Sequence, residues 1–333
     1  LSERIAHKFR IKNTTGYSLN ALVDYTDPID VLAHLMIGSE GTLGFIAEIT
    51  YRTVPEYPYK ASALVFFGGV EAACVAVARL KSEPVDAVEI MDRAALRSVQ
   101  GQPGMPAELS GLPDSASALL IETRAESAAG LSRNVSRIRD ALGTVDTLGE
   151  VDFTDVPEDC ARLWKIRKGM FPSVGAVREA GTTVVIEDIA FPVPRLAEGT
   201  VELQGLFARH GYQNAIIFGH ALEGNLHFVI TPDFGIPAEV ERYHAFMDEL
   251  CHLVVEKYDG SLKAEHSTGR NMAPYVELEW GAEAYALMHR IKALLDPHGM
   301  LNPGVVLNTD PQIHVKNLKS MTAVDPLVDR CIE

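Results

Sequence analysis

The sequence predicts an α+β fold with an antiparallel sheet. Strand and helix patterns alternate from residue 61 to residue 142, in the strand-helix-strand order of an α/β plait. A second observation is the stretch 216–230, where two apolar runs of β-forming residues flank Glu223-Gly224-Asn225. Such a turn-forming cluster between two strand patterns is typical of a β-hairpin.

Length and composition define the class of protein. The chain has 333 residues, enough for one large core or two moderate ones, and 47% of them are hydrophobic. Its formal net charge of −15 argues against nucleic acid or an anionic membrane as the main partner. No apolar run is long enough to cross a bilayer. Four cysteines without paired spacing are typical of a reducing compartment, so we expect a cytoplasmic location, with peripheral association at an inner membrane left open.

The elements of the first half follow from local patterns. Asp27-Pro28 begins a helix, and the alternation of residues 45–52 predicts a strand. Pro55 and Pro58 mark a boundary. Beyond it the sequence predicts strands at 61–67, 87–91 and 118–123, helices at 70–81 and 131–142, and a surface loop at 100–115.

The second half continues with longer helices. The patterns predict helices at 156–174, 195–210, 238–258 and 280–295, a strand at 183–191, and loops at 260–270 and 296–304. The tail from residue 305 has little periodicity and is predicted to be a linker.

The predicted hairpin places two histidines, His220 and His227, near its turn. Cross-strand neighbours lie about 5 Å apart at Cβ, so two imidazoles there can share a metal ion. Glu265, in the later loop, could supply a carboxylate as third ligand and leave a position open for substrate oxygen. The alternative is a hairpin whose two histidines lie near the turn without binding anything.

Three other features are candidates for a site. His266 is a candidate general base, because a histidine side chain is suited to accepting a hydroxyl proton, although most Glu-His pairs are surface residues. The glycines of residues 38–44 can bring the backbone close to a ligand, or form an ordinary turn. The helix at 156–174 carries a cationic cluster that is either a solvated face or contains one arginine for a carboxylate: Arg162, Lys165, Arg167 and Lys168.

Four blocks together resemble the FAD-linked oxidases with a vanillyl-alcohol-oxidase-type flavin domain, in the branch of D-lactate dehydrogenase, glycolate oxidase and D-2-hydroxyglutarate dehydrogenase. Residues 38–44 resemble the flavin-contacting loop, and residues 220–227 resemble the family's H-x-G-D-G-N-L-H block. Glu265-His266 resembles its S-G-E-H-G block. Residues 296–304 resemble its D-P-x-x-x-L-N-P-G block.

The resemblance implies a role for each matching residue. His220, His227 and Glu265 would bind a divalent metal, usually zinc. Asn225 would touch the substrate, Arg167 would bind its carboxylate, and His266 would accept its hydroxyl proton. The residues expected against FAD are Gly38, Ser39, Glu40, Gly41, Thr42, Gly44, Ile46 and Asn302.

Some residues depart from the common pattern. Leu222-Glu223 stands where Gly-Asp is usual, and Ser267 replaces a glycine. These departures resemble a subgroup fused to an iron–sulfur domain, and residues 328–333, with Cys331, resemble the start of a cysteine cluster motif. One cysteine cannot hold a 4Fe-4S cluster, which takes four thiolates.

The resemblance also implies that the chain is a central fragment of a longer protein. Residues 1–55 would be the C-terminal remnant of an FAD domain, and residues 56–295 a substrate cap domain with a ferredoxin-like α/β-plait. Residues 296–333 would form an FAD-contacting turn and a linker toward an absent iron–sulfur domain. We expect the fragment to bind FAD weakly or not at all, and to be inactive by itself.

The parent protein is then expected to oxidise a D-2-hydroxy acid, D-lactate or D-2-hydroxyglutarate, to the 2-oxo acid and to pass electrons to an iron–sulfur domain. D-2-hydroxyglutarate would need a second cation, for which Lys165, Lys168 and Arg270 are candidates. The alternative is a non-catalytic module that binds a metal or ligand and keeps the fold. The final electron acceptor and the oligomeric state stay open.

Overall fold

The structure is a computed structural model that describes residues 1–102 and 105–319. The described residues form two compact units. Unit 1 comprises residues 1–53, 187–192 and 240–319, and unit 2 comprises residues 54–186 and 193–239. In the chain, the first boundary between the units lies at residues 53–54. The expected domains, residues 1–55, 56–295 and 296–333, stay a prediction.

One six-stranded sheet has the order β1-β3-β2-β5-β6-β4. Its described pairings, β1 with β3, β2 with β3 and β5, and β5 with β6, are all antiparallel. The predicted α+β class with an antiparallel sheet is therefore confirmed. The strands are β1 Tyr59–Phe67, β2 Ala87–Met91, β3 Ser117–Ala125, β4 Val185–Ala190, β5 Ile216–His220 and β6 Asn225–Ile230.

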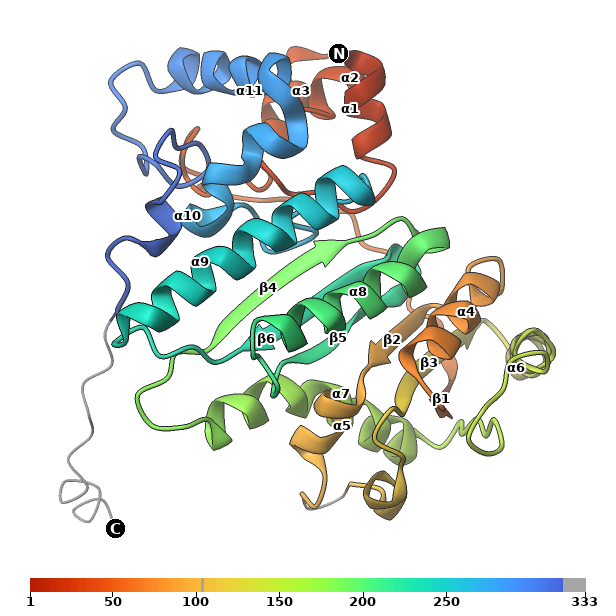
Figure 1. The fold of residues 1–333 in the computed structure, drawn as a ribbon. Coiled ribbons are helices and arrows are strands. Elements are labelled where there is room, and N and C mark those ends of the chain that lie inside the picture. Colours follow the sequence, from red (N-terminus) through yellow and green to blue (C-terminus); the bar gives the residue numbers. More distant parts are fainter. Residues whose placement is uncertain (103–104, 320–333) are drawn as a thin grey trace, which may run out of the picture. The chain divides into compact units, whose positions relative to one another are not determined.

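Both faces of the sheet in unit 2 are covered, so its strands are apolar on both sides. In β3, Ala118 and Leu120 belong to a core that includes Leu96 of α5 and Ile166 of α7. On the other face α4 and α8 lie side by side (Figure 1). The helices are α4 Val70–Leu80, α5 Arg93–Val99, α6 Ala128–Leu142, α7 Pro157–Val177 and α8 Leu196–Arg209.

Unit 1 has a helical core of its own. Trp280 and Met288 of α11 pack with Tyr17 and Leu35, which come from the first 53 residues. Asp27 caps α3 by accepting a hydrogen bond from the amide of Ile29, as the Asp-Pro pattern predicts. The helices are α1 Ser2–Lys8, α2 Ala21–Asp24, α3 Pro28–Leu35, α9 Pro237–His252, which begins in unit 2, α10 Gly269–Met272 and α11 Val276–Leu295.

The predicted strand at 45–52 is wrong for this structure. These residues have no regular secondary structure, and Phe45 and Tyr51 are 91% and 79% exposed. Alternation of apolar and polar residues gives a segment two faces, but a strand also needs a neighbour for its backbone hydrogen bonds. No described segment pairs with residues 45–52.

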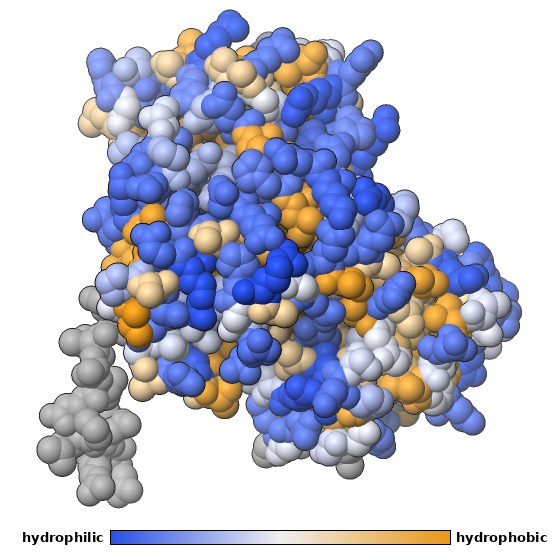
Figure 2. Space-filling model, in the orientation of Figure 1, coloured by the Kyte–Doolittle hydropathy of each residue, from blue (hydrophilic) through white to orange (hydrophobic). Residues whose placement is uncertain are grey.

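The surface seen in Figure 2 is mostly hydrophilic, and its hydrophobic areas are small and separate. This agrees with the acidic composition. None of the helices in the described residues is long and apolar enough to cross a membrane. Cys331 and the predicted start of a cluster motif lie outside the described residues.

Candidate active site

The hairpin of β5 and β6 brings His220 and His227 together. A short 3-10 turn, Ala221–Glu223, and Gly224 with φ of 66° connect the two strands. His227 pairs across the sheet with Phe218, and His220 lies two residues beyond Phe218 on the same face. The two imidazole rings are 5.4 Å apart between centroids and perpendicular, with an interplanar angle of 88°. The two imidazoles are therefore neighbours, as the hairpin pattern predicts.

Glu89 of β2 is a residue of the site that no sequence motif predicts. Its side chain is almost completely buried. Oε1 of Glu89 accepts a hydrogen bond from Nδ1 of His220 at 2.5 Å, and Oε2 accepts one from Nε of Arg167 at 2.7 Å. Burial alone would raise the pKa of Glu89, but the hydrogen bond from His220 and the charge of Arg167 lower it below its ordinary value.

Arg167 differs from the other cations of α7 in its environment. Its side chain is only 15% exposed, and its guanidinium carbon lies 4.4 Å from the centroid of the Phe218 ring. Lys165 and Lys168 on the same helix are exposed. Within the predicted cationic cluster, Arg167 is therefore linked to His220 by the Glu89 carboxylate that both contact. The two lysines lie on the surface of unit 2.

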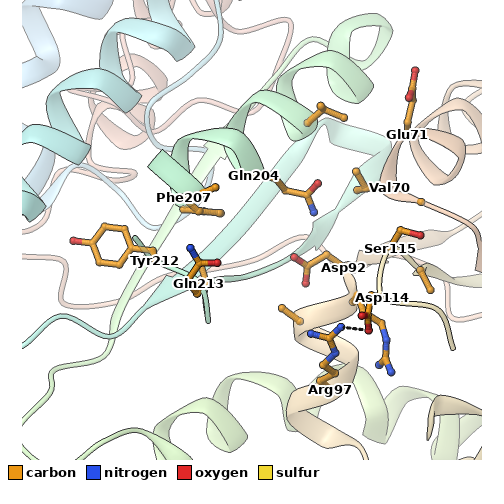
Figure 3. A pocket seen from close by; sticks show the side chains of 17 residues that line it. Val70, Glu71, Asp92, Arg97, Asp114, Ser115, Gln204, Phe207, Tyr212 and Gln213 are labelled. Carbon is orange, nitrogen blue, oxygen red and sulfur yellow. Dashed lines mark hydrogen bonds and ion pairs between the residues drawn. The ribbon is translucent and has the colours of Figure 1, made fainter. Parts of the chain in front are cut away.

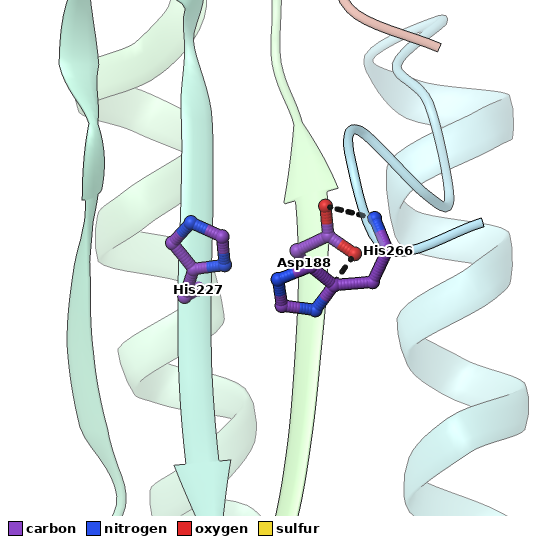
Figure 4. A group of neighbouring side chains, drawn as sticks. All are labelled: Asp188, His227 and His266. Atoms are coloured by element: carbon purple, nitrogen blue, oxygen red, sulfur yellow. Dashed lines mark hydrogen bonds and ion pairs between the residues drawn. The ribbon is translucent and has the colours of Figure 1, made fainter. Parts of the chain in front are cut away.

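The loop that carries Glu265 and His266 is held by Asp188, a fully buried carboxylate of β4. Oδ2 of Asp188 accepts hydrogen bonds from the backbone amides of Glu265 at 2.5 Å and His266 at 3.4 Å. Its other oxygen lies 3.5 Å from Nδ1 of His266 (Figure 4). Asp188 thus fixes both the backbone and the ring of this pair, and the sequence signal for it is an acidic dipeptide inside an apolar strand.

A buried lysine of this loop, Lys263, balances the charge of two acidic residues of β4. Nζ of Lys263 lies 2.7 Å from Oε2 of Glu187 and 3.1 Å from Oδ1 of Asp188. Burial lowers the pKa of Lys263, but the two carboxylates more than offset this and raise it. Lys12 donates a hydrogen bond to Oε1 of Glu265 in the same loop.

The predicted flavin-contacting blocks meet in unit 1. The side-chain amide of Asn302 donates to the backbone carbonyl of Glu40 at 2.7 Å. Nζ of Lys292 joins the same two segments, since it donates to the carbonyls of Thr42 at 2.6 Å and Leu301 at 2.7 Å. Glu40 has a positive φ of 52°, and its side chain accepts a hydrogen bond from the amide of Gly269.

The remaining predicted residues differ in exposure. Ser39 and Thr42 are buried in unit 1, whereas Ile46 is 46% exposed in the segment without regular structure. Gly38 and Gly41 both have positive φ, near 70°, and an added Cβ at Gly41 would meet no atom within 4 Å. Asn225 is completely buried at the start of β6. The backbone of residues 38–44 is therefore shaped as a glycine-dependent turn.

Two sets of side chains among the described residues have the donor types of a metal site: His220, His227 and Glu265, and Asp188, His227 and His266. Imidazoles and a carboxylate suit zinc and other divalent transition metals. Metal binding by either set is a proposal.

A separate pocket lies in unit 2 and contains none of the predicted site residues. Its volume is about 430 Å³, and its lining includes Asp92 and Gln204 (Figure 3). Asp92 caps α5 through the amide of Ala95, and burial raises its pKa to about 6. Arg97 and Asp114 form an ion pair of 2.6 Å at the pocket. The role of Asp92 as the cap of α5 is thus sufficient to explain why its carboxylate is buried at this pocket.

Comparison with known proteins gives one family and many relatives. Residues 57–306 match the family of FAD linked oxidases, C-terminal domain. The chain is 32% identical to the mitochondrial D-lactate dehydrogenase [cytochrome] of Arabidopsis thaliana over 83% of this chain and 47% of that protein. It is 27% identical to glycolate oxidase subunit GlcD of Bacillus subtilis over 85% of this chain and 58% of that protein.

A third relative is D-2-hydroxyglutarate dehydrogenase of Stutzerimonas stutzeri, 27% identical over 90% of this chain and 61% of that protein. The chain thus spans about half the length of the curated relatives that it matches. Among solved structures, 4-ethylphenol oxidase of Gulosibacter chungangensis aligns with a TM-score of 0.54 at 16% identity, over 76% of this chain and 55% of that one. At this identity the match shows a shared fold.

Proposed function

Because the chain belongs to the FAD linked oxidases through their C-terminal domain, we propose that the protein containing it oxidises a small D-2-hydroxy acid to the 2-oxo acid. The names of the relatives, which act on glycolate, D-lactate and D-2-hydroxyglutarate, support this class of substrate. D-Lactate and D-2-hydroxyglutarate are the leading candidates. The observation that carries the proposal is the position of the Glu89 carboxylate. It accepts hydrogen bonds both from Arg167, a cation that could bind a substrate carboxylate, and from His220, a potential metal ligand.

Arg167 would bind the substrate carboxylate. Glu89 occupies its Nε, and among the described residues its two terminal Nη nitrogens have no hydrogen-bond partner. These two nitrogens can donate in parallel to the two oxygens of a carboxylate, which is the strongest geometry for this pair. In an acidic protein such a local cation is what an anionic substrate requires.

His220, His227 and Glu265 would hold a divalent metal, with zinc as the leading candidate. The residues fit this role because two adjacent imidazoles and a carboxylate form a common three-ligand set. The hydrogen bond from Nδ1 of His220 to Glu89 is the kind of outer contact that orients metal-binding histidines. When bound, the metal would act as a Lewis acid on the substrate hydroxyl.

His266 would accept the hydroxyl proton at an imidazole nitrogen. Its side chain is 37% exposed, so substrate can reach it, and the buried Asp188 limits the positions that its ring can take. Asn225 would contribute a polar contact to the substrate. FAD, when bound, supplies the hydride acceptor that makes this proton transfer part of an oxidation.

The turn of residues 38–44, with Ile46 and Asn302, would lie against FAD. The contact of Asn302 with Glu40 supports this, because it joins two predicted flavin blocks into one surface. We further propose that electrons leave through an iron–sulfur domain of the longer protein. The sequence pattern around Cys331, which resembles the start of a cysteine cluster motif, is the basis for this proposal.

The test uses the complete gene product with a panel of D-2-hydroxy acids and an artificial dye as electron acceptor. We expect reduction of the dye with D-lactate or D-2-hydroxyglutarate, and a loss of about 100-fold or more in kcat for His266→Ala. Unchanged turnover in His266→Ala would remove this residue as the base. Absence of turnover with every acid, in a preparation that contains stoichiometric FAD, would contradict the proposed reaction.

A further inference from the structure

We infer that Glu89 is a positioning residue that orients both His220 and Arg167. One buried carboxylate would thus fix the orientation of the side chain that binds the metal and of the side chain that binds the substrate carboxylate. This inference rests on the proposed function. It concerns a residue of β2 that belongs to none of the recognised sequence blocks.

The contacts of Glu89 use both of its oxygens. Oε1 lies 2.5 Å from Nδ1 of His220, and Oε2 lies 2.7 Å from Nε of Arg167. The side chain is 5% exposed, so water competes little for either contact. Strand register supports the arrangement, because Glu89 lies directly opposite His220 in the pairing of β2 with β5.

The contact with His220 selects one ring nitrogen for the metal. A carboxylate accepts hydrogen bonds, so the nitrogen that faces Oε1 must carry the proton. Nδ1–H of His220 therefore points to Glu89, and Nε2 is the nitrogen with a lone pair for a metal ion. Outer carboxylates of this kind fix the tautomer and the ring orientation of metal-binding histidines.

The contact with Arg167 selects one edge of the guanidinium for the substrate. Glu89 takes Nε, and the ring of Phe218 covers one face of the group at 4.4 Å. A substrate carboxylate would then meet the two terminal nitrogens end-on. Without Glu89, the long arginine side chain would lose the contact that fixes its rotamer.

The Glu89→Gln variant distinguishes an orienting role of the carboxylate from a role in which the side chain only fills space. The glutamine amide has the same shape but only one acceptor oxygen, so it cannot accept from both Nδ1 of His220 and Nε of Arg167. Glu122 offers a matched control, since it is another buried glutamate on the neighbouring strand β3. The carboxylate of Glu122 accepts hydrogen bonds from a different set of side chains, those of Ser62, Arg124 and Trp164.

The first measurement is the affinity of the chain for Zn²⁺, determined by competition with a chelating dye. We expect Glu89→Gln to weaken Zn²⁺ binding by roughly 10- to 100-fold, and Glu122→Gln to leave it within about twofold. In a His220→Ala background, Glu89→Gln should cause no further loss, whereas in an Arg167→Met background the full loss should persist. A Zn²⁺ affinity that Glu89→Gln does not change in the wild-type background would overturn the inference.

The second measurement reads the tautomer of His220 by ¹⁵N NMR of the metal-free chain, and it does not depend on metal binding. At about pH 8, where an ordinary imidazole is neutral, we expect the proton on Nδ1 in the wild type and a loss of this preference in Glu89→Gln. A proton on Nε2 in the wild type would overturn the inference. If the tautomer is as expected but the wild type binds no Zn²⁺, the three-ligand proposal fails and the orienting role of Glu89 stands.

Discussion

The side-chain amide of Asn302 donates a hydrogen bond of 2.7 Å to the backbone carbonyl of Glu40, a residue 262 positions earlier in the sequence. Both residues have positive φ, 38° for Asn302 and 52° for Glu40. The contact therefore joins two tight turns whose backbone conformations are unusual for residues other than glycine. It makes the turn of residues 38–44 and the turn of residues 296–304 one structural feature of unit 1.

We predict that Asn302→Ala destabilises this feature by about 1–2 kcal/mol, because alanine loses the hydrogen bond and tolerates positive φ poorly. Asn302→Gly separates the two effects, since it relieves the backbone but also lacks the amide. Hydrogen exchange should show faster exchange of the amides in residues 38–44 for both variants. Unchanged exchange in both variants would show that the contact does not hold the loop.

Lys292 provides a second prediction for the same feature. Besides the two carbonyls, its Nζ donates to Oδ2 of Asp296 at 2.6 Å, so all three of its N–H groups are used. Lys292→Met should lower the free energy of unfolding by about 2–3 kcal/mol, because it leaves the carbonyls of Thr42 and Leu301 without this donor and Oδ2 of Asp296 with only the amide of Leu301. The control is Lys316→Met, which removes an exposed pair with Asp310 and should cost less than about 1 kcal/mol. Chemical denaturation of both variants checks the difference.

Most strands and helices of unit 2 were predictable because their patterns are local, although the short helix α5 was not predicted. The apolar run of β1 is visible from neighbouring residues alone, as is the Asp27 cap of α3 in unit 1. The segment 45–52 shows the limit of this reasoning. Its alternation is a true strand pattern, but whether a strand forms depends on a partner that the pattern does not contain.

Gly219 is predicted to be essential for the hairpin. A Cβ at this position would overlap the carbonyl oxygen of Asn225 and approach Cα of Leu226 to 2.9 Å. Gly219→Ala should therefore cost about 2–4 kcal/mol and separate β5 from β6. Gly205→Ala on α8 is the control, because its Cβ would meet only the flexible end of Arg209 at 3.5 Å and should stabilise the helix slightly. Thermal unfolding of the two variants tests this contrast.

Buried His314 should make the free energy of unfolding depend on pH. Burial first, and then the neighbouring His244, lower the pKa of His314 to about 4, although Asp248 and Asp310 oppose the shift. The nearest ring nitrogen is Nδ1 of His244 at 2.9 Å, and the hydroxyl of Tyr275 is 3.5 Å away. The folded state therefore excludes a proton that the unfolded state binds below about pH 6.5.

The sign of the effect follows from this difference. Between about pH 6.5 and pH 4 the unfolded chain binds more protons than the folded chain, so stability should fall as the pH falls, by on the order of 2–3 kcal/mol. Above pH 6.5 this contribution is constant. His314→Gln should remove this part of the slope in urea unfolding, whereas His252→Gln, on an exposed histidine of α9, should keep it. Equal slopes in the two variants would contradict the assignment.

The candidate site was predictable only in part. His220 and His227 lie in one hairpin, and the turn between them identifies their approach. Glu89 and Asp188 come from distant strands, and each appears in the sequence as an acidic residue inside an apolar run. Such a residue signals a buried partner but does not identify it, because strand order rather than sequence distance decides what it meets.

Metal binding by His220, His227 and Glu265 is tested most directly by an anomalous difference map, recorded at the zinc absorption edge from crystals of the chain grown with Zn²⁺. We expect one strong peak at about 2.1 Å from Nε2 of His220, within bonding distance of His227 and Glu265. A strong peak at other residues, or none at these three in a well-ordered crystal, would contradict it.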